Sequence, residues 1–313
     1  MHAEPHLPNA RTTGEIDVRI ASYQATGEIR VGIVANDRLV DLQSLARRKK
    51  LRVPNDMIAL IEETPTLLLR ALAREVEAWV KGGRESVPLA KAKLLAPIPR
   101  PRKNIFCMGR NYAEHAREGG VAPPEVPVFF TKPPTAVIGP EAPVIHHRVT
   151  QSLDYEVELV AVIGRRGRDI PAAKALDYVF GYTIMNDVTA RDLQRRHQQW
   201  FKGKSLDTFA PMGPWIVHGS AIRNPQALRL SMRVNGEIRQ DSTTANMLFS
   251  VAQLIETLSA GTTLEPGDLL ATGTPEGVGM GFTPPKWLQV GDVVEAEIES
   301  IGVLRNRIVA PAR

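Results

Sequence analysis

Cysteine is nearly absent from this sequence, since Cys107 is the single example in 313 residues. One thiol cannot form an intramolecular disulfide, and its apolar neighbours in NIFCMG favour a buried, unreactive side chain over a nucleophile. No apolar run approaches the roughly 18 residues needed to cross a bilayer, and the first residues lack the basic-then-apolar pattern of a secretory signal. We therefore expect a soluble, cytoplasmic protein with no membrane partner.

Neither sign of charge dominates, because 39 Lys and Arg face 34 Asp and Glu, a formal net charge of +5. A noncatalytic nucleic-acid-binding protein is one hypothesis, suggested by the pI near 9.4 and by the basic region 191–196. The bases are scattered, however, and no basic stripe with interleaved aromatic residues accompanies them. We expect no nucleic-acid partner, and a small anionic ligand fits the charge as well.

Complete phosphate-binding motifs are also missing. The segment 203–205 reads Gly-Lys-Ser, but the first glycine of a P-loop would fall at Gln198. The glycine-rich stretch ATGTPEGVGMG lacks the third glycine of a dinucleotide fingerprint and is followed by two prolines instead of a helix. His146 and His147 are adjacent, so on a strand they point to opposite faces and cannot readily share one metal ion.

Composition divides the chain into a tail and two domains. Residues 1–15 are polar and read as a flexible tail. Residues 16–97 predict a small α+β domain, with short strands over 18–43 and two amphipathic helices between 56 and 80, interrupted at Pro65. Three prolines within 97–101 mark the boundary, and residues 98–313 form the second domain.

The second domain is expected to be mainly β. Short runs rich in β-branched residues alternate with turn signals, as in DYEVELVAVIG, YVFGYTIMND, PWIVHG, LRLSMRVNG, DLLATGT, DVVEAEIES and GVLRNRIV. Its clearest helix is predicted over 245–261, where Gly261 supplies the stop. The fold class is therefore α+β, mainly β.

Carboxylates at two strand ends predict a metal site. Strand alternation places Glu156 and Glu158 on one face, about 7 Å apart at their Cα atoms. An exposed strand face would explain such a pair on its own, but Asp187 ends the next apolar run and can complete an all-oxygen site. Such a site suits Mg²⁺, with Mn²⁺ or Ca²⁺ as substitutes, better than zinc.

Two further clusters carry groups useful for catalysis. His115 and Glu118 are spaced i, i+3 on a short predicted helix, an arrangement that orients an imidazole to act as a base, although a surface ion pair has the same spacing. Lys204 follows in KGKSLDT, where we expect a cation on a flexible loop that can meet an oxyanion.

Seven separated segments resemble the fumarylacetoacetate hydrolase family, in the family's order: GRNYAEHARE, FFTKPPTAVIGP, DYEVELVAVIG, NDVTARDLQ, KGKSLDTFAPMGPWIV, NGEIRQ and ATGTPEGVG. The resemblance covers about residues 100 to 310 and implies a mixed β-sandwich or roll, a homodimer, and a divalent ion on Glu156, Glu158 and Asp187. The family proper has a further aspartate ligand before its arginine-and-histidine segment, whereas residues 105–108 here provide no acid. The three-carboxylate bacterial branch is the closer match.

The resemblance also assigns roles to individual residues. His115 and Glu118 match the water-activating pair of acylpyruvate-cleaving members, and Lys204 matches the lysine near the metal and the oxyanion. Three residues match substrate-contacting positions of the family: Arg110, Gln194 and Thr274. Thr208 matches a position whose hydroxyl lies near the metal.

These roles predict a Mg²⁺-dependent hydrolase of a carbon-carbon bond in a small β-diketo acid, such as an acylpyruvate or fumarylpyruvate. An enolate would develop its charge beside the ion while water activated by His115 attacks the distal carbonyl. The alternatives are oxaloacetate decarboxylation and the isomerisation of 2-hydroxyhepta-2,4-diene-1,7-dioate, which need the same metal site but no attacking water. All three reactions take a small anionic α-keto or β-diketo acid.

Overall fold

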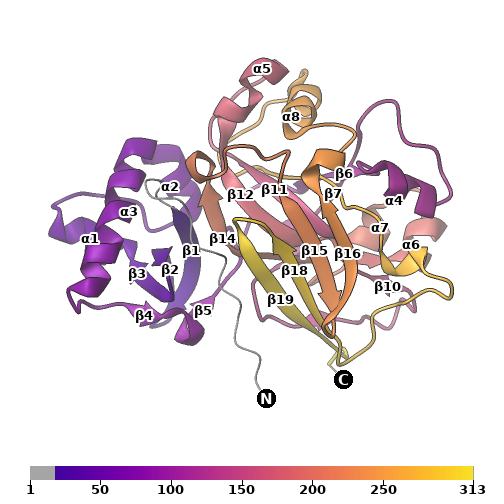
Figure 1. Cartoon of the computed structure of the whole chain (residues 1–313), viewed down its shortest axis with the longest axis horizontal. Coiled ribbons are helices and arrows are strands. Elements are labelled where there is room, and N and C mark those ends of the chain that lie inside the picture. The colour runs from indigo at the N-terminus through magenta and orange to yellow at the C-terminus, as the bar shows by residue number, and fades with distance from the viewer. Residues whose placement is uncertain (1–17, 313) are drawn as a thin grey trace.

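The computed structural model describes residues 18–312, so the predicted tail, residues 1–15, lies outside the described residues. Helices and strands of the first part of the chain group together at the left of Figure 1, beside a larger body of strands. Mixed sheets dominate the architecture, and the predicted class, α+β and mainly β, is confirmed.

The first part of the chain is a strand meander covered by three helices. Its elements are β1 (Arg19–Ala25), β2 (Glu28–Ala35), β3 (Arg38–Asp41), α1 (Leu42–Arg48), α2 (Met57–Glu63), α3 (Thr66–Lys81), β4 (Val87–Pro88) and β5 (Lys93–Leu94). The strands and the two helices separated at Pro65 agree with the sequence. Leu42 and Gln43, predicted as strand, instead begin α1, because the Asp41 side chain accepts a hydrogen bond from the Ser44 N–H at 2.7 Å and caps that helix.

The same sheet continues into the second part of the chain. Strand β1 pairs antiparallel with β14 (Ala210–His218), in the register Arg19 with Val217 and Ile20 with Ile216. The resulting twelve-stranded sheet has the order β4-β3-β2-β1-β14-β12-β11-β17-β6-β7, with β5 and β8 (Val137–Ile138) beside this path. Because one sheet crosses the predicted boundary at 97/98, the division into two domains stays a prediction.

Four neighbouring strands toward one end of this sheet lead into the candidate site described below. They are β6 (Ile105–Gly109), β11 (Val157–Ile163), β12 (Val179–Asn186) and β17 (Leu269–Ala271), and β7 (Val128–Lys132) forms the edge. All seven residues of β11 are buried, since both faces of the sheet are covered here. Six of its seven residues are apolar and the exception is Glu158, a composition that fits a strand covered on both faces.

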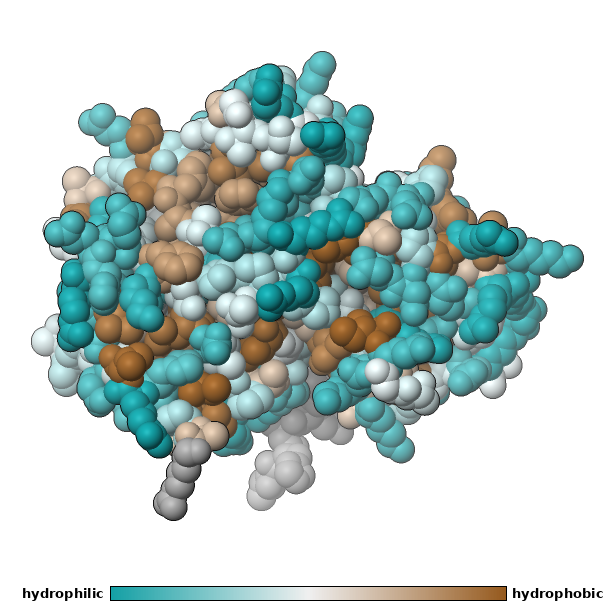
Figure 2. Space-filling model, turned by 180° about the vertical axis from the view of Figure 1, so that it is seen from behind, coloured by the Kyte–Doolittle hydropathy of each residue, from teal (hydrophilic) through white to brown (hydrophobic). Residues whose placement is uncertain are grey.

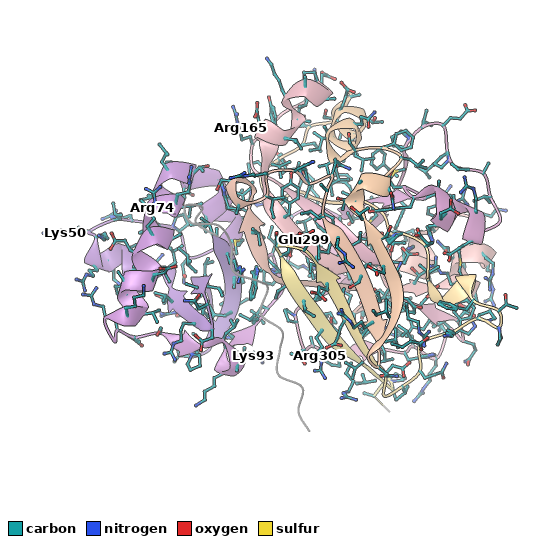
Figure 3. The ribbon with its side chains drawn as sticks, in the orientation of Figure 1. Lys50, Arg74, Lys93, Arg165, Glu299 and Arg305 are labelled. Atoms are coloured by element: carbon teal, nitrogen blue, oxygen red, sulfur yellow. The ribbon has the colours of Figure 1, made fainter. Side chains whose placement is uncertain are left out.

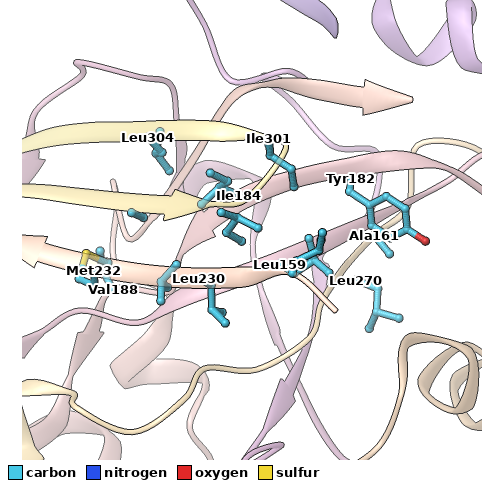
Figure 4. Packing of buried hydrophobic residues seen from close by; sticks show 14 of the residues in the cluster. Leu159, Ala161, Tyr182, Ile184, Val188, Leu230, Met232, Leu270, Ile301 and Leu304 are labelled. Atoms are coloured by element: carbon cyan, nitrogen blue, oxygen red, sulfur yellow. The ribbon is translucent and has the colours of Figure 1, made fainter. Parts of the chain in front are cut away.

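A second sheet of five strands packs on one face of the large sheet. Its order is β16 (Glu237–Thr243), β15 (Arg229–Val234), β18 (Val293–Ile298), β19 (Gly302–Val309) and β9 (Val144–Ile145). Figure 4 shows the core between the sheets, where Leu159 and Ile184 of the large sheet meet Leu230 and Leu304 of the small one. The opposite face of the large sheet packs against residues of α1, α2 and α3.

The remaining elements border the sandwich: β10 (Leu153–Asp154), β13 (Thr189–Ala190), α4 (Ala113–Glu118), α5 (Ala172–Ala175), α6 (Arg191–Arg196), α7 (Phe201–Lys204) and α8 (Val251–Ser259). Helix α8 is shorter than the predicted 245–261, because a capping box of Ser250 and Gln253 begins it six residues later. Gly261 has φ +72°, a conformation that glycine adopts without strain, and it lies just past the helix end as predicted.

Polar side chains cover most of the visible surface. Figure 2 shows hydrophobic residues as separate patches among hydrophilic ones. The basic residues labelled in Figure 3 come from distant parts of the chain, with Arg74 on α3, Arg165 after β11 and Arg305 on β19. In the part of the chain that the structure describes, the search for a helix long and apolar enough to span a bilayer finds none.

A single buried amide fastens the connection from β6 to α4. The Asn111 side chain donates to the carbonyl oxygens of Phe249 at 3.0 Å and Thr272 at 2.8 Å, and accepts from the Phe249 N–H at 2.9 Å. Asn111 is fully buried, so water cannot replace these hydrogen bonds.

We expect Asn111→Ala to lower the free energy of unfolding by about 2–4 kcal/mol, because it leaves buried backbone groups without partners. Urea titration followed by circular dichroism measures the change. Asn104→Ala is the matched control, because that exposed amide makes one bond, to Thr131 Oγ1 at 3.2 Å, and its loss costs about 0.5 kcal/mol or less. Equal destabilisation by both variants would contradict the assignment.

Candidate active site

Three carboxylates meet at the adjoining ends of β11 and β12. Glu156 precedes β11, Glu158 is its second residue, and Asp187 follows β12 directly. The antiparallel pairing of Val157 with Asn186 brings these strand ends together, and one oxygen from each carboxylate lies within 4.8 Å of the others. All three residues are at most 4% exposed, so the exposed-face interpretation of the glutamate pair is wrong.

Three cations neutralise two of these carboxylates. Lys204 Nζ lies 2.8 Å from Glu156 Oε2 and 2.7 Å from Asp187 Oδ2. Arg191 Nη2 lies 2.5 Å from the other Glu156 oxygen, and Lys132 Nζ lies 2.5 Å from Asp187 Oδ1. The prediction of a flexible loop at Lys204 is wrong, since this residue ends α7 and is 2% exposed. Pairing is what allows such charges to be buried.

Ionisation of these groups follows from their partners. Burial raises the pKa of Glu156, but attraction to Lys204 and Arg191 outweighs it and leaves that pKa well below its usual range. Burial lowers the pKa of Lys204, because here too it disfavours the charged form. Attraction to Asp187 and Glu156 outweighs burial and raises that pKa overall, so the ammonium stays charged. Lys132 differs, because burial outweighs its attraction to Asp187 and lowers its pKa.

Glu158 is the carboxylate without a cationic partner. Within residues 18–312 no lysine or arginine forms an ion pair with it, and its Oε2 accepts only the Gly273 N–H, at 3.0 Å. Burial, then repulsion from Asp187 and Glu156, raises its pKa well above the usual value. A divalent cation supplies the missing positive charge, so the buried cluster of three oxygens fits a hard metal ion.

The predicted imidazole-carboxylate pair is present on α4. His115 Nδ1 lies 3.6 Å from Glu118 Oε2, slightly beyond hydrogen-bond range, and both atoms are buried without another partner in the described chain. The second glutamate oxygen accepts the Gly277 N–H at 2.8 Å, which fixes the carboxylate against the loop after β17. The facing atoms of the pair are therefore buried and the carboxylate is oriented, so this is not a solvent-exposed surface ion pair, although the Glu118 side chain is 22% exposed.

One cavity of about 420 Å³ joins the metal cluster and this pair, and a cavity of that size holds a small ligand. The predicted residues that line it are Arg110, His115, Glu118, Glu156, Glu158, Gln194, Lys204 and Thr274. Gln194 Oε1 accepts from Arg191 at 3.1 Å and Thr274 Oγ1 from Gln240 at 2.9 Å, so both side chains are held in place. Their substrate contacts stay predictions.

Three residues do not line this cavity: Asp187, which is fully buried behind it in the carboxylate cluster, Thr208 and Cys107. The Thr208 hydroxyl accepts the Ile145 N–H at 2.9 Å, and Thr208 does not line the cavity within the described residues. Its role as a hydroxyl near a metal stays a prediction. Cys107 is buried in β6, and burial raises the pKa of its thiol well above the usual value, as an unreactive cysteine requires.

Sequence reasoning missed two buried cations. Lys132 lies in the quoted segment FFTKPP, and a lysine at the end of an apolar strand was a signal that could have found it. Arg191 was read only as part of a basic region, whereas its guanidinium bridges Asp154 at 2.8 Å and Glu156 at 2.5 Å. Both residues form ion pairs with carboxylates of the cluster, and charge counting along the sequence cannot reveal such pairings.

Comparison with known proteins identifies the family of this chain. The family model for the fumarylacetoacetate (FAA) hydrolase C-terminal region matches residues 104–309. The chain is 48% identical over 302 residues to oxaloacetate tautomerase YisK of Bacillus subtilis (strain 168), covering 91% of this chain and 99% of that protein. It is 41% identical over 262 residues to the mitochondrial oxaloacetate tautomerase FAHD2A of Bos taurus, covering 82% and 81% respectively.

Solved structures extend the comparison. The crystal structure of 2-hydroxyhepta-2,4-diene-1,7-dioate isomerase from Mycobacterium marinum matches with a TM-score of 0.73 at 32% identity, covering 95% of this chain and all of that one. The chain therefore belongs to the fumarylacetoacetate hydrolase family, and the resemblance of its seven segments is confirmed. It is an enzyme of that superfamily.

We expect Mg²⁺ to stabilise the wild-type protein against unfolding by about 2.7 kcal/mol at a concentration of 100 times Kd, and Glu158→Gln to weaken Mg²⁺ binding by more than roughly 10-fold. The glutamine removes the charge that the cation neutralises. Thermal melts with Mg²⁺ and with EDTA measure both effects. Glu299→Gln, at an exposed position in the turn before β19 (Figure 3), serves as control and keeps the full Mg²⁺ response. An unchanged response in Glu158→Gln would remove this residue from the ligand set.

Proposed function

We propose that this enzyme interconverts the enol and keto forms of a small 2-oxo dicarboxylic acid such as oxaloacetate, with Mg²⁺ held by Glu156, Glu158 and Asp187. The observation that carries the proposal is the meeting, in one cavity, of Glu156 and Glu158 from the buried carboxylate cluster with His115. The similar proteins named oxaloacetate tautomerase support it, as does the isomerase of similar fold.

The cations of the cavity suit an anionic substrate. Arg110 and Arg195 line it without an ion pair inside the described range, whereas Arg191 is committed to Asp154 and Glu156. When bound, a divalent cation supplies Lewis-acid stabilisation to a 2-oxo acid that chelates it. Lys204, charged and buried beside the same carboxylates, adds positive potential where enolate charge develops.

Tautomerisation requires that C3 gain one proton while the enol oxygen loses one. We assign the proton transfer at C3 to His115, since an imidazole both accepts and donates protons. Glu118 orients the ring and stabilises its protonated form. Lys204 is less suited to this transfer, because two of its N–H groups are bound to Glu156 and Asp187.

Hydrolysis of an acylpyruvate is the second candidate function, and the His115–Glu118 pair is the observation that favours it. A base with a carboxylate partner can activate water as well as move a carbon-bound proton. Decarboxylation of oxaloacetate requires only stabilisation of the enolate, so it shares the metal site and needs no base. The three reactions give products of different mass.

The test dilutes the enol form of oxaloacetic acid into buffer containing Mg²⁺ or EDTA and follows loss of the enol ultraviolet absorbance. Acceleration by the Mg²⁺-loaded enzyme with unchanged substrate mass supports the tautomerase. Loss of carbon dioxide identifies a decarboxylase. Pyruvate released from an acylpyruvate in a parallel assay identifies the hydrolase, and no acceleration with any substrate rejects the proposal.

We expect His115→Gln to slow enol-keto conversion by about 10²–10⁴-fold, the usual contribution of a general acid-base group. Mg²⁺ stabilisation in thermal melts should be unchanged, since the imidazole is not a proposed ligand. Glu114→Gln is the matched control on α4, where this exposed side chain pairs with Arg117. Full activity in His115→Gln would transfer the proton-carrying role to another group.

A further inference from the structure

Two aromatic rings form one wall of the active-site cavity, and each faces a different cation. The rings of Phe130 and Trp200 meet edge to face, with centroids 5.4 Å apart. Lys204 Nζ lies 5.1 Å from the Phe130 centroid, and the Arg110 guanidinium carbon lies 5.0 Å from the Trp200 centroid. All four residues line the cavity. The aromatic pair therefore separates a cation at the carboxylate cluster from a second cation, Arg110.

Arg110 is held by Trp200 rather than by an acid. Across the described residues its guanidinium has no ion pair and no hydrogen bond, so its five N–H groups can bind a ligand. Its backbone φ is +59°, in the left-handed region that residues with a side chain rarely adopt. Strain of this kind persists at sites where the surrounding structure fixes a side chain in one direction.

Trp200 in turn occupies a position that Gly109 leaves open. A Cβ atom at Gly109 would lie 2.2 Å from Trp200 Cζ3 and 2.7 Å from Cη2, far inside van der Waals contact. The indole therefore lies directly on the backbone at the end of β6, and Phe130 of β7 meets it from the side. An alanine at position 109 would displace the ring.

We propose that Trp200 is a positioning residue that fixes Arg110 to bind the distal carboxylate of the substrate, and so makes the site selective for dicarboxylates over 2-oxo monocarboxylates. A guanidinium can stack on an indole and still donate two parallel hydrogen bonds to a carboxylate. Arg191 cannot take this role, because Asp154 and Glu156 occupy it. The inference rests on the proposed function only in taking the ligand to be a 2-oxo acid.

The test measures binding to the Mg²⁺-loaded full chain by isothermal titration calorimetry, without turnover. One ligand is 3,3-difluoro-oxaloacetate, which cannot enolise, and the other is pyruvate, which lacks the distal carboxylate. Trp200→Leu should weaken binding of the dicarboxylate by about ten-fold or more, the loss expected for a charged hydrogen bond. Pyruvate binding should change by less than about two-fold, and Trp200→Phe, which keeps an aromatic face, should restore most of the selectivity.

Two further variants separate positioning from simple loss of packing. Gly109→Ala should reproduce the selective loss although Trp200 is unchanged, whereas Gly219→Ala, whose Cβ would lie 3.5 Å from its nearest neighbour, should leave both ligands unaffected. Combining Trp200→Leu with Arg110→Gln should add nothing to the loss from Arg110→Gln alone.

Equal weakening of both ligands by Trp200→Leu, or no weakening of either, would overturn the proposal, as would a wild-type protein that binds the two ligands with equal affinity. Thermal melts confirm that each variant is folded. Because oxaloacetate turnover does not enter the measurement, a wild-type enzyme without tautomerase activity would refute the proposed function and leave the binding ratios standing.

Discussion

Burial of three carboxylates at one point is the constraint around which this protein is organised. Like charges within 4.8 Å of one another repel strongly away from water, so the fold must supply positive charge from several directions. It does so with Lys132 from the edge strand β7, Arg191 from α6 and Lys204 from α7. Glu158 is left without a cation in the described chain, and a divalent ion bound to the cluster would supply one.

The sandwich makes that arrangement rigid. Strands β11 and β12 are buried on both faces, and the five-stranded sheet packs on one of them. Their ends carry the carboxylates, while α4, α6 and α7 lie together at the right of Figure 1. The first part of the chain contributes to the site indirectly, by extending the sheet that holds it. A continuous sheet through β1 and β14 links the two parts.

Patterns local in sequence predicted much of the architecture. Strand alternation predicted that Glu156 and Glu158 lie together, and they meet at the start of β11; the i, i+3 spacing of His115 and Glu118 predicted their contact on α4. The predicted end of one strand and the predicted start of one helix were wrong by a few residues, because a helix cap competed there with the apolar pattern. Asp41 started α1 inside a predicted strand, and Ser250 delayed the start of α8, because capping hydrogen bonds outweighed apolar periodicity.

The sequence by itself determined the family and predicted which residues meet at the site, because strand and helix periods fix which side chains share a face and because the family resemblance rests on contiguous motifs. Only the tertiary structure decided how those residues are neutralised and oriented. Lys132 meets Asp187 across 55 positions of sequence, and Trp200 lies on Gly109, which is distant along the chain. Such contacts arise from the pairing of strands and the packing of helices on them, which no local pattern encodes.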